Sequence, residues 1–264
     1  MPELSDVLLL CLAAAFAGWI DAVSGGGGLV QLPALLLLLP GAAPAQILAT
    51  NKLSAICGTA VAGVTYYRKL RPDLRTALPM AGIVLLGSAL GALFASLLPR
   101  EVFRPLVLVL LVGVAIYTAV RPGLGAVQSL RWEGRQHHVA AGLGGFGLGF
   151  YDGIFGPGTG SFLVFLLVGL LGYSFLQASA KARIVNVATN LGALLVFIPQ
   201  GAPMWRLGLL MGLCNMAGSW AGAHTAIRRG SGFVRFVFLA VVAGLILRLG
   251  YDVVRDLTTC GGCG

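Results

Sequence analysis

Long apolar runs, separated by short polar stretches, make up most of this chain. The eight runs are residues 5–39, 45–66, 76–98, 102–120, 138–175, 178–198, 205–227 and 233–254. A helix needs roughly 20 apolar residues to cross the hydrocarbon core of a bilayer. Only 10% of the residues are charged, whereas a soluble domain has about a quarter. The sequence therefore predicts an all-α polytopic membrane protein.

The net charge of +9 could indicate a nucleic-acid partner, but the distribution of the basic residues argues against one. Almost all Lys and Arg lie in short stretches between apolar runs, as the positive-inside rule of membrane proteins expects. We therefore predict the lipid bilayer as a partner, and no nucleic acid. We also expect no metal and no other cofactor, because the sequence has no Cys/His set at metal-ligand spacing.

A carboxylate and four consecutive glycines interrupt the first apolar run. The stretch reads GWIDAVSGGGGL and places Asp21 four residues before Gly25. A second version, GFYDGIFGPGTG, places Asp152 four residues before Gly156. The aspartate and the glycine both recur at an offset of 131 residues. We predict that each motif breaks a helix and that the two breaks together form the working site.

The same offset relates other parts of the chain. The stretch GSALGA at 87–92 matches GSWAGA at 218–223, and Arg104 matches Arg235. The tripeptide at 50–52 aligns with that at 179–181 at an offset of 129, which requires a two-residue gap in the alignment. We infer two repeated halves of about four helices each, the first helix of each half being broken. The predicted division is 1–120 for the first transmembrane repeat, 121–138 for a polar linker, 139–256 for the second repeat and 257–264 for a flexible tail.

The length of the broken run bears on how the halves are oriented. Residues 29–39 would make about 16 Å of helix, too short for a hydrocarbon core of about 30 Å, and residues 5–39 together about 52 Å, too long for one crossing. A hairpin of unequal helices fits both lengths and gives each half an odd number of crossings. We therefore favour an inverted repeat over a parallel one, which the distribution of Lys and Arg does not exclude.

The glycines of the two motifs permit positive φ and close backbone approach. They unwind the helix and expose N–H groups at the start of the next half-helix, where an anion is favoured. Broken helices near the midplane of repeated halves are the usual binding site of secondary transporters. For the glycine pairs at 87/91 and 218/222 we expect a plain helix–helix contact instead.

Several polar side chains inside the apolar runs could act at such a site. A buried aspartate costs about 2.5–3.5 kcal/mol on insertion scales, so Asp21 and Asp152 are either protonatable coupling groups or caps of the half-helices that follow. Lys52 and Lys181 could attract an anion or extend to the membrane interface. Asn51, Asn186 and Asn190, with Thr50 and Thr189, could bind an oxyanion or bond helices together.

The remaining titratable residues do not indicate an enzyme. His224 is a lone histidine for which we expect a packing role, and we expect His137 and His138 to be solvated in the polar stretch. No HExxH, GxSxG or P-loop pattern is present in the sequence. We therefore predict that the chain is not an enzyme.

Four stretches of the chain resemble the sulfite exporter TauE/SafE family of membrane permeases. They are GWIDAVSGGGGLVQLP, the following TNK, GFYDGIFGPGTGSFL and AKARIVNVATNLGALLVF. The resemblance covers roughly residues 5–254. It implies a multi-pass transporter of the bacterial inner membrane, of about eight transmembrane segments, whose substrates are small sulfur-containing anions such as sulfite or organosulfonates. It also implies an asymmetric site, because Val61 stands where the first half would match Asn190.

We therefore predict a secondary transporter for a small sulfur-containing oxyanion or organosulfonate, coupled to protons through Asp21 or Asp152. A passive anion channel, an intramembrane enzyme and an assembly protein are the alternatives, and a homodimer is left open. The predicted substrate-binding residues are Gly25, Gly26, Gly27, Gly28, Asn51, Lys52, Gly156, Gly158, Thr159, Gly160, Lys181, Asn186 and Asn190.

Overall fold

The computed structural model describes residues 4–95, 129–131, 134–154 and 156–260, and within these ranges its regular structure is entirely helical. The described part contains eight α-helices and one π-helical turn. The all-α prediction is therefore confirmed. The helix that we predicted at residues 102–120 lies outside the described residues.

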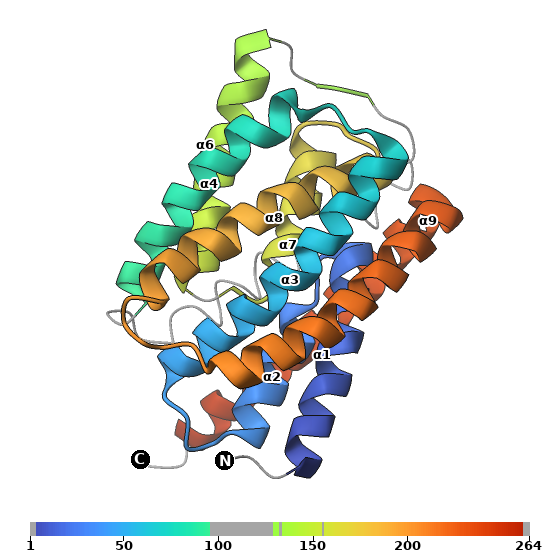
Figure 1. The fold of residues 1–264 in the computed structure, drawn as a ribbon. Coiled ribbons are helices and arrows are strands. Elements are labelled where there is room, and N and C mark those ends of the chain that lie inside the picture. The colour runs from blue at the N-terminus through green and yellow to red at the C-terminus, as the bar shows by residue number, and fades with distance from the viewer. Residues whose placement is uncertain (1–3, 96–128, 132–133, 155, 261–264) are drawn as a thin grey trace.

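The first broken run forms two unequal helices, α1 (Leu4–Ser24) and α2 (Gly28–Leu38). Leu10 and Ala14 of α1 share one core cluster with Leu32 and Leu35 of α2. The shorter helix therefore folds back alongside the longer one, as expected for a hairpin of unequal helices (Figure 1).

Two longer helices follow, α3 (Pro44–Leu70) and α4 (Leu74–Phe94). Both begin where the sequence supplies a start signal. Pro44 opens α3, where its missing N–H is no loss, and the Gln46 side chain accepts a hydrogen bond from the Ala43 N–H (3.1 Å). The Asp73 carboxylate accepts one from the Arg75 N–H (3.0 Å) at the start of α4.

The second broken run forms α6 (Gly134–Ile154), α7 (Thr159–Phe165) and the π-helical turn η1 (Leu166–Leu170). Helices α8 (Phe175–Phe197) and α9 (Trp205–Cys260) complete the chain. Helix α9 bends at Gly230, whose φ of 75° lies outside the helical region. This bend separates the two helices that we predicted at 205–227 and 233–254.

The helices pack in pairs that are far apart in the sequence. The most extensive contacts join α1 to α9 and α4 to α6, followed by those of α3 with α9 and of α4 with α8 (Figure 1). Small residues make these contacts close. A Cβ atom on Gly218 would lie 1.8 Å from the backbone oxygen of Ala15, and one on Gly91 would lie 2.1 Å from that of Phe150. The helix-contact role that we expected of these glycines is confirmed.

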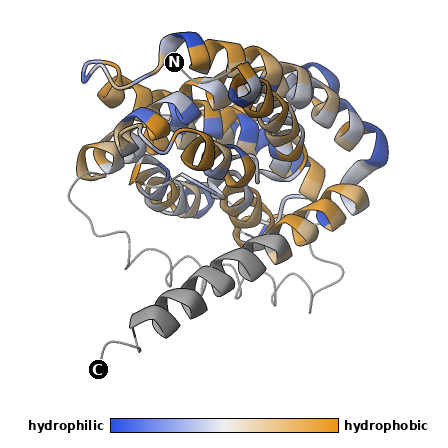
Figure 2. Cartoon of the chain, turned by 90° about the horizontal axis from the view of Figure 1, so that it is seen from below, coloured by the Kyte–Doolittle hydropathy of each residue, from blue (hydrophilic) through white to orange (hydrophobic). Residues whose placement is uncertain are grey.

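Four described helices are long and apolar enough to cross a membrane: Leu4–Ser24, Ala45–Leu70, Leu74–Phe94 and Phe175–Phe197. Two shorter apolar helical stretches, Gly28–Leu38 and Thr159–Leu170, lie next to the breaks. Figure 2 shows apolar residues along most of the described helices, with the hydrophilic ones confined to short stretches. This pattern is typical of a multi-pass membrane protein.

Helix α6 begins inside the polar stretch for which we predicted a linker, and this changes the position of His137. We expected this side chain in solvent, but it is 6% exposed. Its Nε2 atom lies 3.0 Å from the Thr76 hydroxyl and 3.2 Å from the Tyr173 hydroxyl. The expectation for His137 was wrong because its partners come from segments distant in the sequence.

Candidate functional site

The two breaks touch each other through their backbones. The Ser161 N–H donates to the carbonyl oxygen of Gly25 (3.1 Å), and the Ser161 hydroxyl donates to that of Ser24 (3.1 Å). Gly25 has a φ of 92°, and a Cβ atom there would lie 2.1 Å from the carbonyl carbon of Gly160. A glycine is therefore required at this crossing both for its conformation and for lack of space.

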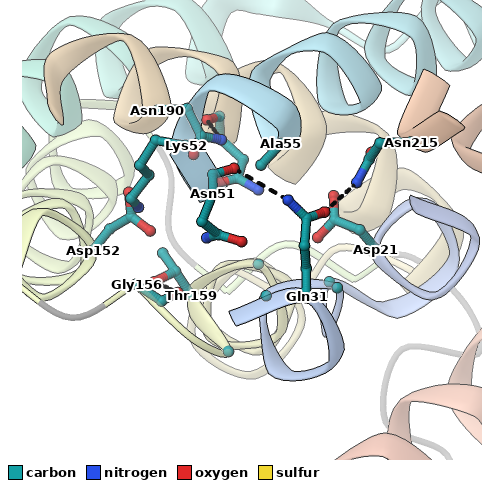
Figure 3. A pocket seen from close by; sticks show the side chains of 16 residues that line it. Asp21, Gln31, Asn51, Lys52, Ala55, Asp152, Gly156, Thr159, Asn190 and Asn215 are labelled. Atoms are coloured by element: carbon teal, nitrogen blue, oxygen red, sulfur yellow. Dashed lines mark hydrogen bonds and ion pairs between the residues drawn. The ribbon is translucent and has the colours of Figure 1, made fainter. Parts of the chain in front are cut away.

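A polar cavity lies beside this crossing (Figure 3). The space open to the centre of a water molecule is about 30 Å³, which is room for about two waters or a small ion. The lining residues come from both broken runs and from α3, α8 and α9. They are Asp21, Gly25, Gly27, Gly28, Gln31, Asn51, Lys52, Ala55, Asp152, Gly156, Gly158, Thr159, Gly160, Asn186, Asn190 and Asn215.

Lys52 and Asp152 form an ion pair at the cavity. The Lys52 Nζ atom lies 2.5 Å from an Asp152 carboxylate oxygen. Both residues are buried, at 3% and 2% exposed. Lys52 comes from α3 and Asp152 from the end of α6. The pair therefore joins the helix that follows the first broken run to the second broken run. A buried charge is tolerated only with such a partner.

A second ion pair joins Asp21, at the end of α1, to Arg183 of α8. The Arg183 Nη1 atom donates to the Asp21 carboxylate (2.7 Å) and also to the Asp21 backbone oxygen (2.6 Å). Arg183 is completely buried. Lys52 and Arg183, like Asp21 and Asp152, stand 131 residues apart.

Carboxamides supply most of the remaining polar lining. Asn215 donates to the Gln31 side-chain oxygen (2.8 Å), and Asn190 donates to the backbone oxygen of Asn186 (2.8 Å). The Asn51 side-chain oxygen is buried and has no hydrogen-bond partner among the described residues. Because a buried acceptor without a partner is costly, this atom indicates that a water or a ligand occupies the cavity.

The structure brings thirteen of the fifteen predicted site residues to this cavity and leaves out Gly26 and Lys181. A Cβ atom on Gly26 would face Val241, on the apolar side of the break. The Lys181 ammonium donates to the backbone oxygen of Asp73 and lies 4.7 Å from the centre of the Tyr173 ring. Lys181 precedes Arg183 by two residues, or about 200° around a helix, so the two side chains cannot face the same neighbours.

Sequence reasoning missed three lining residues, Gln31, Ala55 and Asn215, as well as Arg183 behind the cavity. A signal for Arg183 was present, because it stands 131 residues after Lys52, at the offset that relates the two motifs. Gln31 and Asn215 could have been found as polar residues within apolar runs. Nothing in the sequence singled out Ala55.

Outside the cavity, the described residues do not form a metal centre. No group of three His, Cys, Asp or Glu side chains that could hold a metal ion occurs among them. The ring nitrogen of His224 lies 2.8 Å from the backbone oxygen of Trp220, one turn earlier on α9, and His224 does not line the cavity.

Comparison with known proteins agrees with this architecture. Residues 10–249 match the family model of the sulfite exporter TauE/SafE. A probable membrane transporter protein, ORF9, of Sinorhizobium sp. is 37% identical over 260 residues, which cover 97% of this chain and 98% of that protein. The probable membrane transporter protein YfcA of Escherichia coli (strain K12) is 33% identical over 248 residues, covering 92% and 89%. A probable membrane transporter protein of Haemophilus influenzae is 33% identical over 252 residues, covering 94% and 96%.

No solved structure gives a significant match. The family match nevertheless spans nearly the whole chain, and the relatives cover it almost end to end. Their names and the apolar helices together indicate a multi-pass membrane transporter of the bacterial inner membrane. The chain belongs to the sulfite exporter TauE/SafE family of membrane transporters.

Proposed function

We propose that this protein is a secondary transporter that carries a small sulfur-containing oxyanion or organosulfonate, bound in the cavity between the two broken helices. The observation that carries the proposal is the composition of the cavity wall. It combines a lysine, five carboxamides and glycine-rich backbone, in a chain that is otherwise apolar. Polar groups at membrane depth are rare and mark the path of a substrate.

Two features of the wall favour an anion over a cation. Each carboxylate at the cavity already has a basic partner, Arg183 or Lys52. A cation would have to compete with that partner, whereas an anion can share the three N–H donors of the Lys52 ammonium. Carboxamide N–H groups and the glycine backbone add neutral donors of the kind that bind oxyanions.

The two halves are proposed to be an inverted repeat. Contacts between them recur at the offset of 131: Gly218 lies against Ala15 as Gly87 lies against Phe146. The two ion pairs recur in the same way, each joining one half to the other. The hairpin of α1 and α2 agrees with the odd number of crossings per half that we expect from the sequence and that an inverted repeat requires. Rocking of such halves about a shared site would expose it to the two sides in turn.

Proton coupling is proposed to run through Asp21 or Asp152, the two carboxylates at the cavity. A passive anion channel through the same cavity is the alternative. An enzymatic role is disfavoured, because the cavity wall in the described part of the chain holds no histidine or cysteine that could serve as nucleophile or base.

Thermal unfolding of the purified protein with sulfite, sulfate, thiosulfate and methanesulfonate tests the binding. An anion at 100 times its Kd should stabilise the fold by about 2.7 kcal/mol. Counterflow in proteoliposomes then separates a carrier from a channel, because only a carrier accelerates tracer uptake when unlabelled anion is inside. If no anion shifts the unfolding temperature and none shows counterflow, the proposed function is wrong.

A further inference from the structure

The two ion pairs differ in their access to the cavity. Lys52 and Asp152 both line it, so an ion in the cavity can reach both partners. Arg183 does not line it and is completely buried behind Asp21. Because Arg183 also holds the Asp21 backbone oxygen (2.6 Å), this pair is fastened at two points, whereas Lys52 and Asp152 meet through their side chains.

Lys52 lies where the second break leaves room for its ammonium. A Cβ atom on Gly156 would lie 3.0 Å from the Lys52 Nζ atom, so the absence of a side chain there lets the ammonium lie against the backbone. Asn51, whose side-chain oxygen has no hydrogen-bond partner in the described part of the chain, immediately precedes Lys52 on α3. The Lys52 ammonium and the unpaired Asn51 side-chain oxygen therefore face the same cavity.

The surroundings of Asp152 contain few other charges. Lys52 of α3 is the charged group that faces it in the described part of the chain. Tyr151, the neighbouring residue on α6, is titratable, but its hydroxyl donates a hydrogen bond to the backbone oxygen of Pro157 (2.7 Å). Asp21 is the other charged residue on the cavity wall in the described part of the chain, and it is paired with Arg183 behind it.

The charges of these four residues sum to zero. A bound anion adds one or more negative charges to a small cavity, and among the described residues Lys52 alone lines it as a cation. An anion on the Lys52 ammonium takes the position of the Asp152 carboxylate, which is then buried without a counter-ion. An unpaired buried carboxylate is costly enough that it takes up a proton instead. One monovalent anion and one proton restore a net charge of zero, whereas a divalent anion leaves one negative charge.

We propose that Lys52 and Asp152 form an exchange site, in which a monovalent oxyanion replaces the Asp152 carboxylate on Lys52 and Asp152 takes up one proton from the side that is open to water. Release reverses the step: the proton leaves Asp152, and Lys52 returns to it. The substrate class is therefore a monoanion such as hydrogensulfite or an alkanesulfonate, moved with one proton and without net charge. The proposal rests on the proposed function, and it assigns Asp21 to holding Arg183 in place.

Flux through the wild-type protein tests the charge balance without any variant. Proteoliposomes are given methanesulfonate, a monoanion, or sulfate, a dianion, with a pH-sensitive dye inside and a potassium diffusion potential set by valinomycin. We expect methanesulfonate to enter with one proton per anion and at a rate that the potential does not change. Transport that follows the potential, or a preference for sulfate, would overturn the exchange site. An absence of counterflow for every anion would count against the proposed function itself.

Two variants with the same change of charge, Asp152→Asn and Asp21→Asn, test which of the two aspartates takes up the proton. In Asp152→Asn the proton movement should be lost. Methanesulfonate should also bind more tightly, because the Asp152 carboxylate no longer competes with it for Lys52. Its Kd, measured by calorimetry on the detergent-purified protein, should fall about tenfold. In Asp21→Asn we expect less folded protein, but the molecules that do fold should still move one proton per anion. The opposite result, with coupling lost in Asp21→Asn and kept in Asp152→Asn, would refute the assignment.

Discussion

Replacing Arg183 by methionine should be among the most destabilising changes in the described part of this protein. Arg183 is completely buried, and its Nη1 atom makes two hydrogen bonds to Asp21, at 2.6 and 2.7 Å. The variant leaves the Asp21 carboxylate without its counter-ion. Breaking a buried pair in this way costs about 3–5 kcal/mol, which is a factor of roughly 100 to 4,000 in the unfolding equilibrium.

The double variant Asp21→Asn/Arg183→Met distinguishes an unpaired charge from simple loss of packing. Removing both charges leaves no orphan, so the double variant should be more stable than Arg183→Met alone. Arg228→Met, at an exposed arginine of α9, is the control and should change stability by less than about 0.5 kcal/mol. Unfolding in detergent, followed by circular dichroism, gives the four values. A double variant no more stable than Arg183→Met alone would show that the unpaired Asp21 carboxylate is not what destabilises the protein, and the reasoning would fail.

Two further changes test the crossing of the breaks and the cavity wall. Gly25→Ala should prevent normal folding, because φ is 92° and the new Cβ would lie 2.1 Å from Gly160. In the control Gly41→Ala no atom of the described residues lies within 4 Å of the new Cβ, so the unfolding temperature should stay within about 3 °C of wild type. Equal stability of the two variants would contradict the close approach at Gly25. Asn215→Leu removes the 2.8 Å bond to Gln31 at the cavity and should raise the anion Kd about tenfold, measured by calorimetry, whereas an unchanged Kd would place the anion elsewhere.

The breaks and the glycine part of the site could be predicted because their signal is local. A carboxylate and several glycines inside an apolar run are unfavourable in a regular membrane helix. Their presence alone therefore marks a position where the helix is interrupted. Repetition at a fixed offset then shows that the two positions belong together. The structure places Asp21, Gly25, Asp152 and Gly156 on the wall of one cavity.

The basic partner in the second half was harder to identify because residue identity and spacing disagree. Matching Lys52 to another lysine selects Lys181 and requires a gap of two residues, whereas the constant offset selects Arg183. The structure pairs Arg183 with Asp21 and gives Lys181 a backbone partner at the start of α4. Where two motifs recur at a constant offset, the position around the helix determines the neighbours, so spacing is the more reliable guide.

The buried cluster of His137, Thr76 and Tyr173 could not be predicted by any local rule. His137 stands in a polar stretch that resembles a loop, and its two partners lie 61 and 36 residues away in the sequence. A polar residue in such a stretch is expected in solvent unless a long-range partner is known. The packing of α6 on α4 supplies Thr76, and the segment just before α8 supplies Tyr173.

The parts of the cavity wall that do not repeat bear most directly on which anion the proposed site would prefer. The ion pairs recur at the offset of 131, but Gln31 corresponds to Phe162 and Asn215 to Val84. In the proposed site, Lys52 can hold any small monovalent anion, because an ammonium is a point charge without directional preference. The carboxamides of Gln31 and Asn215 are fixed in direction by the hydrogen bond between them. We therefore expect substitution of Gln31 or Asn215 to change the preference among sulfite, thiosulfate and alkanesulfonates. Substitution of Lys52 should weaken the binding of all three alike.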